Sequence, residues 1–339
     1  MEPTLYQHFS RRYPLTADRP LYLVSTPHDA GMLAVDHGHR IHWETCGNPN
    51  GKPVLVVHGG PGSGAGSGWL RYFNPDEYCV VLLDQRGCGQ STPNVGLTTE
   101  GLLANDTPHL IADMEQLREH LGIERWMLFA CSWGTTLSLS YAVTHPDRVT
   151  ELVLWSVVTT TKPEVDWLTW SMGHLFPQEF VNFLAPVGPL PVGGNIPLAY
   201  HRLLASPDPA IHLPASRAWC DWEDRIVSLG NRIERTERFE DDAFRVCFAR
   251  LVTLYFGNYA FQSDTHISGN LGRLAHVPVV LLRGRLDISS QLSVSWRLHQ
   301  GLPLSDLYIV DDTGHGASQC TNGLLVSATE HFYTQWAQG

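Results

Sequence analysis

The sequence predicts an α/β fold: a mostly parallel, doubly wound sheet with an inserted helical segment. Two observations lead to this prediction. Short β-branched apolar runs alternate with helical patterns along much of the chain, and such alternation produces parallel strands with helices on both faces. The alternation stops after Ser156 and resumes after about Gln262, which indicates an insertion between two strands of the sheet.

The composition excludes several classes of protein. The chain has 339 residues, of which 43% are hydrophobic and 17% charged, and its formal net charge is −11. Because phosphate binding needs clustered lysines and arginines, this acidic balance argues against a nucleic-acid partner. No apolar run approaches the roughly 20 residues of a membrane span. The first 15 residues do not resemble a signal peptide, so we expect a cytoplasmic protein with no membrane partner.

The seven cysteines are scattered and form no CxxC pair. Closely spaced cysteine pairs are typical of zinc sites, and an even set at regular spacing is typical of disulfide frameworks. Neither is indicated here, so we expect reduced thiols and no metal.

The strands follow in chain order. An antiparallel hairpin, formed by Gly31–Val35 and Arg40–Glu44, is expected to lead into the sheet. Six further apolar runs have the length of buried strands. They are Val54–Val57, Val80–Leu83, Trp126–Ala130, Leu152–Trp155, Val277–Leu282 and Leu307–Val310.

Helical patterns separate several of these runs. Apolar residues at three- and four-residue spacing predict a helix over Pro108–Leu121, and a second helix over Thr135–Thr144 ends before a proline. Within the insertion the clearest helices are Ala215–Leu229 and Asp241–Tyr255, and Pro186–Pro197 reads as a loop. The predicted domains are residues 1–155 and 263–339 for the sheet, and 156–262 for a helical cap.

Ser132 lies where the third apolar run passes directly into a helix, in Cys131-Ser132-Trp133-Gly134. A serine at such a strand–turn–helix junction is typical of the nucleophile elbow G-x-S-x-G, here with Ala130 at the first glycine position. Small residues are needed because the turn is strained and neighbouring backbone approaches closely. The alternative is an ordinary serine N-cap.

A serine nucleophile needs a base and an orienting acid, which in this arrangement follow in the order Ser, Asp, His. Asp287 follows the Val277–Leu282 run, and His315 follows Leu307–Val310. Loops at strand ends are where catalytic side chains gather. Asp311 and Asp312 compete for the role of the acid, but they share a loop with His315. An acid from the neighbouring strand end gives the simpler geometry.

The glycine-rich segment His58-Gly59-Gly60-Pro61-Gly62 supplies a fourth part. Backbone N–H groups near Gly60 and at Trp133 can stabilise an oxyanion, whereas His58 is expected to support the loop. The alternative for a glycine-rich loop is phosphate binding, but this one has neither a GxGxxG pattern nor a Walker lysine. Together the four parts favour a serine hydrolase.

From about Gly31 to the C-terminus, the chain resembles the prolyl aminopeptidase (proline iminopeptidase) family of α/β-hydrolases. The HGGPG and DQRGxGxS motifs together are specific to this family and its near relatives. The matching segments are Ile41–Pro49, His58–Gly62, Asp84-Gln85-Arg86-Gly87-Cys88-Gly89-Gln90-Ser91, Ile111–Arg118, Ser132-Trp133-Gly134 and Tyr141–Pro146.

The resemblance implies Ser132 as nucleophile, Asp287 as acid and His315 as base. It also implies an enzyme that removes an N-terminal residue, usually proline, without a metal or cofactor. In the cap, Ala218–Glu223 is similar to the family's AWxxWE segment, whose glutamate, here Glu223, pairs with the substrate's α-amino group. A second family glutamate is replaced here by Val252.

Three further expectations concern neighbouring side chains. Trp219 and Trp222 share a helix face, so they either pack in the cap core or form an aromatic wall for the substrate. Glu223 itself has a plain alternative, as a solvated helix residue. Asp84 and Arg86 are expected to anchor loops.

The leading hypothesis is therefore a serine peptidase that releases an N-terminal proline or small residue through an acyl-enzyme. In a second hypothesis the same catalytic residues hydrolyse a different amide or ester, such as a small metabolite, because Val252 suits a more apolar substrate. A third is a non-catalytic ligand-binding homologue. The oligomeric state is left open.

Overall fold

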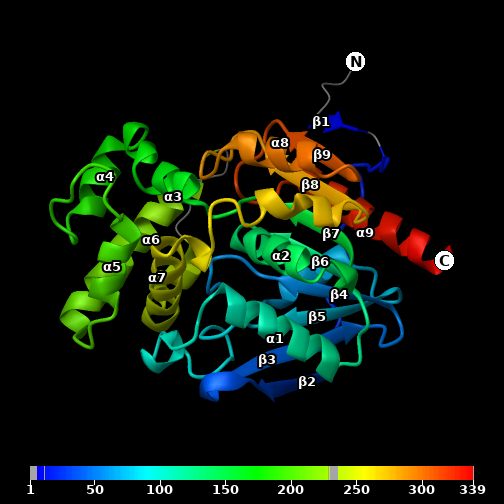
Figure 1. Cartoon of the computed structure of the whole chain (residues 1–339), viewed down its shortest axis with the longest axis horizontal. Coiled ribbons are helices and arrows are strands. Elements are labelled where there is room, and N and C mark those ends of the chain that lie inside the picture. Colours follow the sequence, from blue (N-terminus) through cyan, green and yellow to red (C-terminus); the bar gives the residue numbers. More distant parts are fainter. Residues whose placement is uncertain (1–5, 11, 228, 230–235, 339) are drawn as a thin grey trace.

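The sheet runs through the middle of the molecule (Figure 1). The computed structural model describes residues 6–10, 12–227, 229 and 236–338, and in these residues nine strands form one sheet in the order β1-β9-β8-β7-β6-β4-β5-β3-β2. The six strands from β9 to β5 in this order are parallel to one another, which confirms the predicted class. The strands are β1 (Tyr6–Phe9), β2 (Pro27–Ala34), β3 (Arg40–Gly47), β4 (Lys52–Val57), β5 (Tyr78–Leu83), β6 (Trp126–Cys131), β7 (Val149–Trp155), β8 (Val279–Gly284) and β9 (Ser305–Val310).

Every predicted strand is present, including the antiparallel hairpin of β2 and β3. Several strands begin earlier than predicted, whereas β8 begins later, at Val279 rather than Val277. Pro278 stands just before the strand, and a proline cannot donate a ladder hydrogen bond. The edge strand β1, which pairs antiparallel with β9, has no apolar run and was not predicted.

The parallel strands are buried on both faces because their side chains alternate between two cores. In β6, Leu128 and Ala130 belong to one core, whereas Met127 and Phe129 belong to the other. Helices α1 (Thr107–His120), α2 (Trp133–Thr144) and α8 (Leu292–Gly301) contribute to the first core, and α9 (Gln319–Gln338) contributes to the second. Neither α8 nor α9 was predicted from the sequence.

The segment between β7 and β8 forms a cap of helices on one side of the sheet, to the left in Figure 1. Its helices pack against one another around an aromatic-rich core of their own. They are α3 (Lys162–Thr169), α4 (Pro177–Leu184), α5 (Ile196–Leu204), α6 (Pro209–Val227) and α7 (Asp242–Gly257).

The cap helices agree with the sequence prediction in position and differ in extent. The predicted helix Ala215–Leu229 overlaps α6, which starts six residues earlier and ends at Val227. Residue 228 lies outside the described residues. The expected loop ends where α5 begins at Ile196, with Pro197 in its first turn, a position that proline tolerates. All these helices lie within 156–262, and the domain boundaries themselves stay a prediction.

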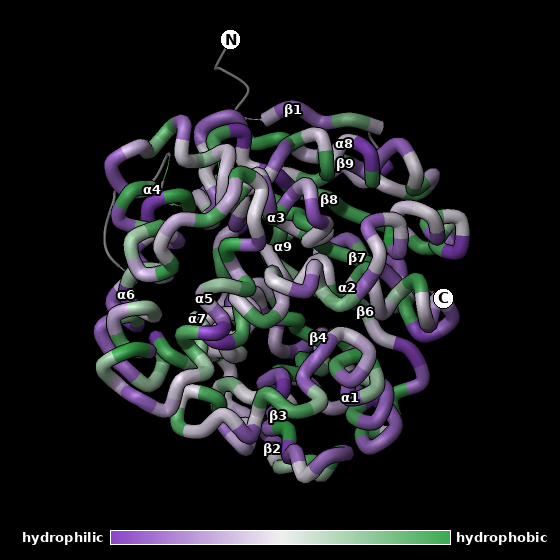
Figure 2. Tube along the Cα trace, turned by 60° about the vertical axis from the view of Figure 1, so that its left-hand side comes forward, coloured by the Kyte–Doolittle hydropathy of each residue, from purple (hydrophilic) through white to green (hydrophobic). Residues whose placement is uncertain are grey.

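The hydropathy of the trace follows this layered arrangement. Hydrophobic segments lie along the inner strands and hydrophilic ones mark many outer turns and helix ends (Figure 2). Among the helices in the described ranges, we find none with the length and apolar character needed to cross a membrane.

Candidate active site

Ser132 occupies a strained turn between β6 and α2. Its φ of 56° and ψ of −130° lie outside the regions that most residues adopt. The turn allows α2 to approach β4 so closely that a Cβ on Gly134 would stand 2.1 Å from the carbonyl oxygen of Val57. The Ser132 side chain forms no capping hydrogen bond to the helix, so the N-cap alternative does not describe it.

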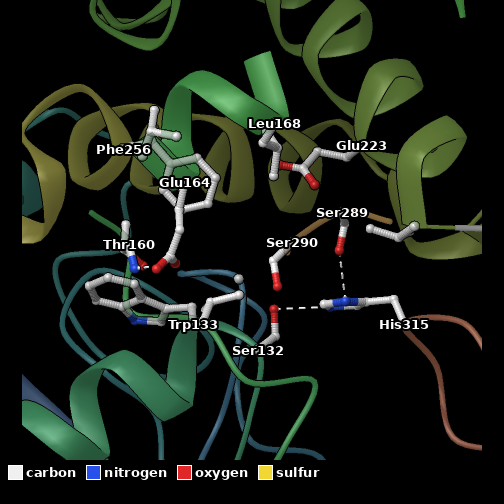
Figure 3. Close-up of a pocket in the computed structure, with 14 residues that line it drawn as sticks. Ser132, Trp133, Thr160, Glu164, Leu168, Glu223, Phe256, Ser289, Ser290 and His315 are labelled. Carbon is white, nitrogen blue, oxygen red and sulfur yellow. Dashed lines mark hydrogen bonds between the residues drawn. The ribbon is translucent and has the colours of Figure 1, made fainter. Parts of the chain in front are cut away.

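The hydroxyl of Ser132 instead faces His315. The distance from Ser132 Oγ to His315 Nε2 is 3.0 Å (Figure 3). His315 Nδ1 lies 2.9 Å from Asp287 Oδ2. The structure therefore brings together the three side chains that the sequence singled out from three separate strand ends. The competing Asp311 pairs with Arg285 at 2.5 Å, away from His315.

Asp287 is held in its charged form by buried partners. Its carboxylate lies 3.0 Å from Arg283 Nη1, with both side chains fully buried, and it accepts a 2.6 Å hydrogen bond from Ser289 Oγ. Burial alone would raise the pKa of Asp287, but His315 and Arg283 outweigh it and hold this pKa below its usual value. A permanently negative Asp287 suits the orientation and stabilisation of a protonated His315.

Sequence reasoning missed Arg283 and Ser289. Arg283 also donates to the carbonyl oxygens of Val157 and Asp287, so it ties the acid-bearing loop to the end of β7. Arg283 lies four residues before Asp287, and this spacing is the sequence signal that could have indicated the pair. Ser289 Oγ lies 3.0 Å from His315 Nδ1 as well, and it therefore contacts both members of the pair.

The glycine-rich loop is supported from behind by buried side chains. His58 Nδ1 lies 2.9 Å from the carbonyl of Gly59, and its Nε2 accepts a 3.2 Å hydrogen bond from the backbone N–H of Gln85. Gln85 Oε1 also accepts from the indole of Trp133 at 3.2 Å. Gly60 has a φ of +109°, which glycine adopts without strain.

These contacts bring the two predicted oxyanion donors to one site. Gly60 and Trp133 line the same pocket as Ser132. The N–H of Trp133 belongs to the first turn of α2, where backbone donors have no partner within the helix. Burial lowers the pKa of His58, and this neutral imidazole fits the supporting role expected for it.

Two pockets meet at Ser132. Gly60, Ser132, Glu223, Val227 and His315 line both. The smaller pocket encloses about 500 Å³ and its walls are mainly apolar. The apolar side chains in its walls are Trp133, Val158, Val165, Leu168, Val227 and Phe256.

The larger pocket encloses about 1230 Å³ and extends between the glycine-rich loop and the cap. Its lining includes Ser63, Trp69, Asp224, Arg238 and Phe248. Ser132 thus lies between a small, mainly apolar pocket and a larger, more polar pocket.

Glu223 reaches from α6 into the junction of these pockets (Figure 3). Its side chain is buried, so it is not the solvated helix residue of the alternative interpretation. Burial raises the pKa of Glu223 to about 7, although the positive charge of His315 opposes this shift. Within the described residues Glu223 forms no ion pair, and it is therefore a carboxylate suited to an external cation.

The other cap residues singled out from the sequence lie elsewhere. Trp219 and Trp222 are fully buried in the cap core, where Trp222 stacks on Phe183 at 4.8 Å between ring centroids. Neither indole lines the two pockets, so core packing describes them and a substrate-facing wall does not. Val252 is also fully buried in that core.

Glu164 is a second carboxylate in the smaller pocket, and sequence reasoning missed it. Its oxygens accept hydrogen bonds from the backbone N–H groups of Thr159 and Thr160 at 2.8 and 2.9 Å, and from the hydroxyl of Thr159. These bonds fix the loop after β7 and use both oxygens. Glu164 is therefore a loop anchor that adds negative charge to the pocket.

Asp84 and Arg86 anchor loops, as expected. Asp84 accepts hydrogen bonds from the backbone N–H groups of Ala65 and Gln90, both at 2.8 Å. Buried Arg86 forms a two-pronged pair with Asp113 at 2.5 and 2.7 Å.

One group in the described ranges has metal-ligand chemistry. Atoms of Asp36, His37 and His109 lie within 4.8 Å of one another at the β2–β3 turn and the start of α1. None of these residues lines the pockets at Ser132, so the group belongs to a different part of the surface.

Comparison with known proteins agrees with this geometry. A family model described as the alpha/beta hydrolase fold matches residues 52–318. The chain is 47% identical over 316 residues to a probable proline iminopeptidase of Streptomyces coelicolor, covering 92% of this chain and 97% of that protein. It is 40% identical to a proline iminopeptidase of Xylella fastidiosa, with 93% and 99% covered.

Solved structures show the same fold at low sequence identity. MGS-M2, an alpha/beta hydrolase from a deep-sea metagenome library, superposes with a TM-score of 0.57 at 16% identity, covering 88% of this chain and 97% of that one. A putative epoxide hydrolase from Pseudomonas aeruginosa gives 0.56 at 19% identity, with 94% and 98% covered. These likenesses concern the fold alone.

Proposed function

Since this chain belongs to the proline iminopeptidase family and has the alpha/beta hydrolase fold, we propose that it is a serine aminopeptidase. It releases an N-terminal proline or another small residue from a peptide. The observation that carries the proposal is the hydrogen-bonded series Ser132–His315–Asp287, which opens onto an apolar pocket with Glu223 at its rim.

The geometry supports a two-step acyl transfer. Ser132 Oγ attacks the carbonyl carbon of the scissile bond while His315 Nε2 takes its proton, and Asp287 stabilises the imidazolium. The N–H groups at Gly60 and Trp133 stabilise the oxyanion. His315 then protonates the leaving amine. In the second step it takes a proton from water, whose oxygen attacks the acyl group and frees Ser132.

Substrate selection rests on the smaller pocket and Glu223. The first residue of a peptide has no residue before it, so a small pocket with mainly apolar walls suits a proline ring. Its ammonium group would pair with Glu223, a buried carboxylate without a cation among the described residues. A charge-assisted hydrogen bond of this kind contributes about 1.5–3 kcal/mol.

A second candidate is a hydrolase for a different amide or ester. Val252 favours it, because this fully buried valine occupies the position of the second amine-binding glutamate in the family pattern. Preference for an N-acylated substrate over the free amine would support this candidate.

The direct test of the nucleophile is Ser132→Ala. We expect turnover of prolyl-4-nitroanilide to fall at least about a thousandfold, because the remaining oxyanion donors provide only residual catalysis. A fluorophosphonate should label the wild type and not the variant. Undiminished turnover by Ser132→Ala would contradict the assignment, and a wild type that resists the label would favour the non-catalytic alternative.

We also propose that the protein works in the cytoplasm. All seven cysteines are free, as suits a reducing compartment.

A further inference from the structure

The two pockets at Ser132 differ in a way that assigns the two halves of a substrate. The residue that is acylated onto Ser132 is the first residue of the peptide and has no residue before it, so the smaller pocket can hold it. The leaving peptide continues beyond the scissile bond and needs a wider passage. The larger pocket, between the glycine-rich loop and the cap, has that room.

Arg238 lies in the lining of this larger pocket. Its Nη1 donates a 3.0 Å hydrogen bond to the carbonyl oxygen of Ser63, and its guanidinium carbon lies 4.7 Å from the ring centroid of Phe244. One contact comes from the glycine-rich loop and the other from α7. Together they hold the guanidinium between the sheet domain and the cap.

Two of the guanidinium's nitrogens, Nε and Nη2, have no hydrogen-bond partner in the described part of the chain. These atoms form the edge with which arginine binds a carboxylate through two parallel hydrogen bonds. The known contacts therefore orient Arg238 while its carboxylate-binding edge remains available.

The charges around Arg238 favour an external anion. No carboxylate of the described residues forms an ion pair with it, although the chain carries a net charge of −11. The nearby Asp224 is already used, since it accepts hydrogen bonds from the N–H and hydroxyl of Thr236. Arg238 itself is exposed at the pocket, so an external anion can reach it.

We propose that Arg238 binds the C-terminal carboxylate of the leaving peptide, so that the enzyme prefers short peptides with a free C-terminus. Glu223 at the start of the substrate and Arg238 at its end would then recognise opposite charges on either side of Ser132. This inference rests on the proposed aminopeptidase function and adds a second specificity site to it.

The test compares each short peptide with its C-terminal amide. Prolyl dipeptides, tripeptides and tetrapeptides are assayed as free acids and as amides, and the acid-to-amide ratio of kcat/KM is taken for each length. In the wild type we expect at least one length to favour the free acid by about tenfold or more, the effect of one charge-assisted contact. The ratio cancels any general loss of activity in a variant.

Three variants complete the experiment. Arg238→Gln should bring the ratio close to one, and Arg238→Lys should restore part of it because the charge is kept but the two-pronged geometry is lost. Arg217→Gln is the matched control, since Arg217 is a partly exposed cap arginine paired with Glu240; its ratio should equal that of the wild type.

The outcomes separate the two proposals. A wild-type ratio near one at every length, or an unchanged ratio in Arg238→Gln, would overturn the carboxylate site while leaving the aminopeptidase intact. Failure of the wild type to cleave prolyl-4-nitroanilide, which has no C-terminal carboxylate, would instead overturn the proposed function.

Discussion

The carboxyl group of Glu223 forms no ion pair with another described residue of the protein. The carboxyl group is buried at the junction of the two pockets, and burial raises its pKa to about 7. An ammonium group from a substrate would supply the missing partner. The same feature that suits Glu223 to bind an amine therefore makes it unfavourable for the stability of the empty protein.

Glu223→Gln should stabilise the empty protein at alkaline pH. The folded-state pKa of about 7 stands above the usual value of 4.5, so the wild type loses stability relative to the variant as pH rises from 4.5 to 7. Above that range the difference should be on the order of 3 kcal/mol in unfolding free energy. Urea unfolding of both proteins at several pH values measures it.

The exposed Glu124 provides the control for this experiment. Glu124→Gln should leave the pH dependence of unfolding unchanged, because the Glu124 side chain is exposed to solvent in the folded protein. A difference between Glu223→Gln and the wild type that is constant with pH would contradict the expected role of burial.

Single residues were predictable where their position in a strand–loop pattern carried the signal. Ser132 directly follows β6, Asp287 and His315 lie in the loops after β8 and β9, and Gly60 lies in the loop after β4. Arg283, Ser289 and Glu164 could not be found in the same way, because their roles arise from packing between segments that are distant in the chain. The catalytic roles of all these residues stay predictions for the experiments above.

The junction of β6 and α2 depends on close approach between a helix and a strand. A Cβ on Gly134 would lie 2.1 Å from the carbonyl oxygen of Val57 in β4, and neither backbone can move without displacing Ser132. Ser132 is thus positioned by the packing of two elements as well as by its own turn.

Gly134→Ala should therefore destabilise the protein by about 2–4 kcal/mol, because the added methyl group overpacks the helix against the strand. Thermal and urea unfolding measure the loss. Gly68→Ala is the matched control, since a Cβ there meets nothing within 4 Å; its stability should match the wild type. Equal stability of both variants would show that α2 can shift away from β4.

At the level of elements, the buried strands and the helices beside them were predictable because their apolar spacing is strong. The strand β1 was not, because its four residues, Tyr6–Phe9, pair at an edge of the sheet and carry no apolar run. Helix α8 buries one face, whereas α9 is buried on all sides from Gly323 to Thr329; neither pattern was identified. The ends of elements moved where proline limits the backbone, as at Pro278.

The cap and the sheet domain are joined by buried polar contacts as well as by apolar packing. Arg250 of α7 donates to the carbonyl oxygen of Val95 in the sheet domain at 2.5 Å and to that of Leu204 in α5 at 2.8 Å. Its side chain is buried. This arginine therefore links the helices that roof the pockets to the domain that carries Ser132.

Arg250→Met should lower the free energy of unfolding by about 2–4 kcal/mol, because it leaves two buried carbonyl oxygens without donors. Urea unfolding measures this change. Arg217→Met, at a partly exposed arginine of the same cap, should have little effect. A loss no larger in Arg250→Met than in this control would mean that the buried contacts do not contribute to docking.

For the whole molecule, chain length and the interrupted alternation were enough to predict an insertion in an α/β fold. The pockets could not be predicted, because each is lined by residues from both the sheet domain and the cap. The charge of −11 indicated little about function. Of the two charges relevant to the proposed substrate, Glu223 was singled out by the family resemblance, whereas Arg238 became identifiable only through its surroundings.

The most direct test of the central claim is the ratio of kcat/KM for prolyl-4-nitroanilide to that for N-acetylprolyl-4-nitroanilide. We expect the free amine to be favoured by about a hundredfold, as one charge-assisted contact in a buried site allows. Glu223→Gln should remove most of this preference. Equal or faster turnover of the acetylated substrate by the wild type would contradict the aminopeptidase.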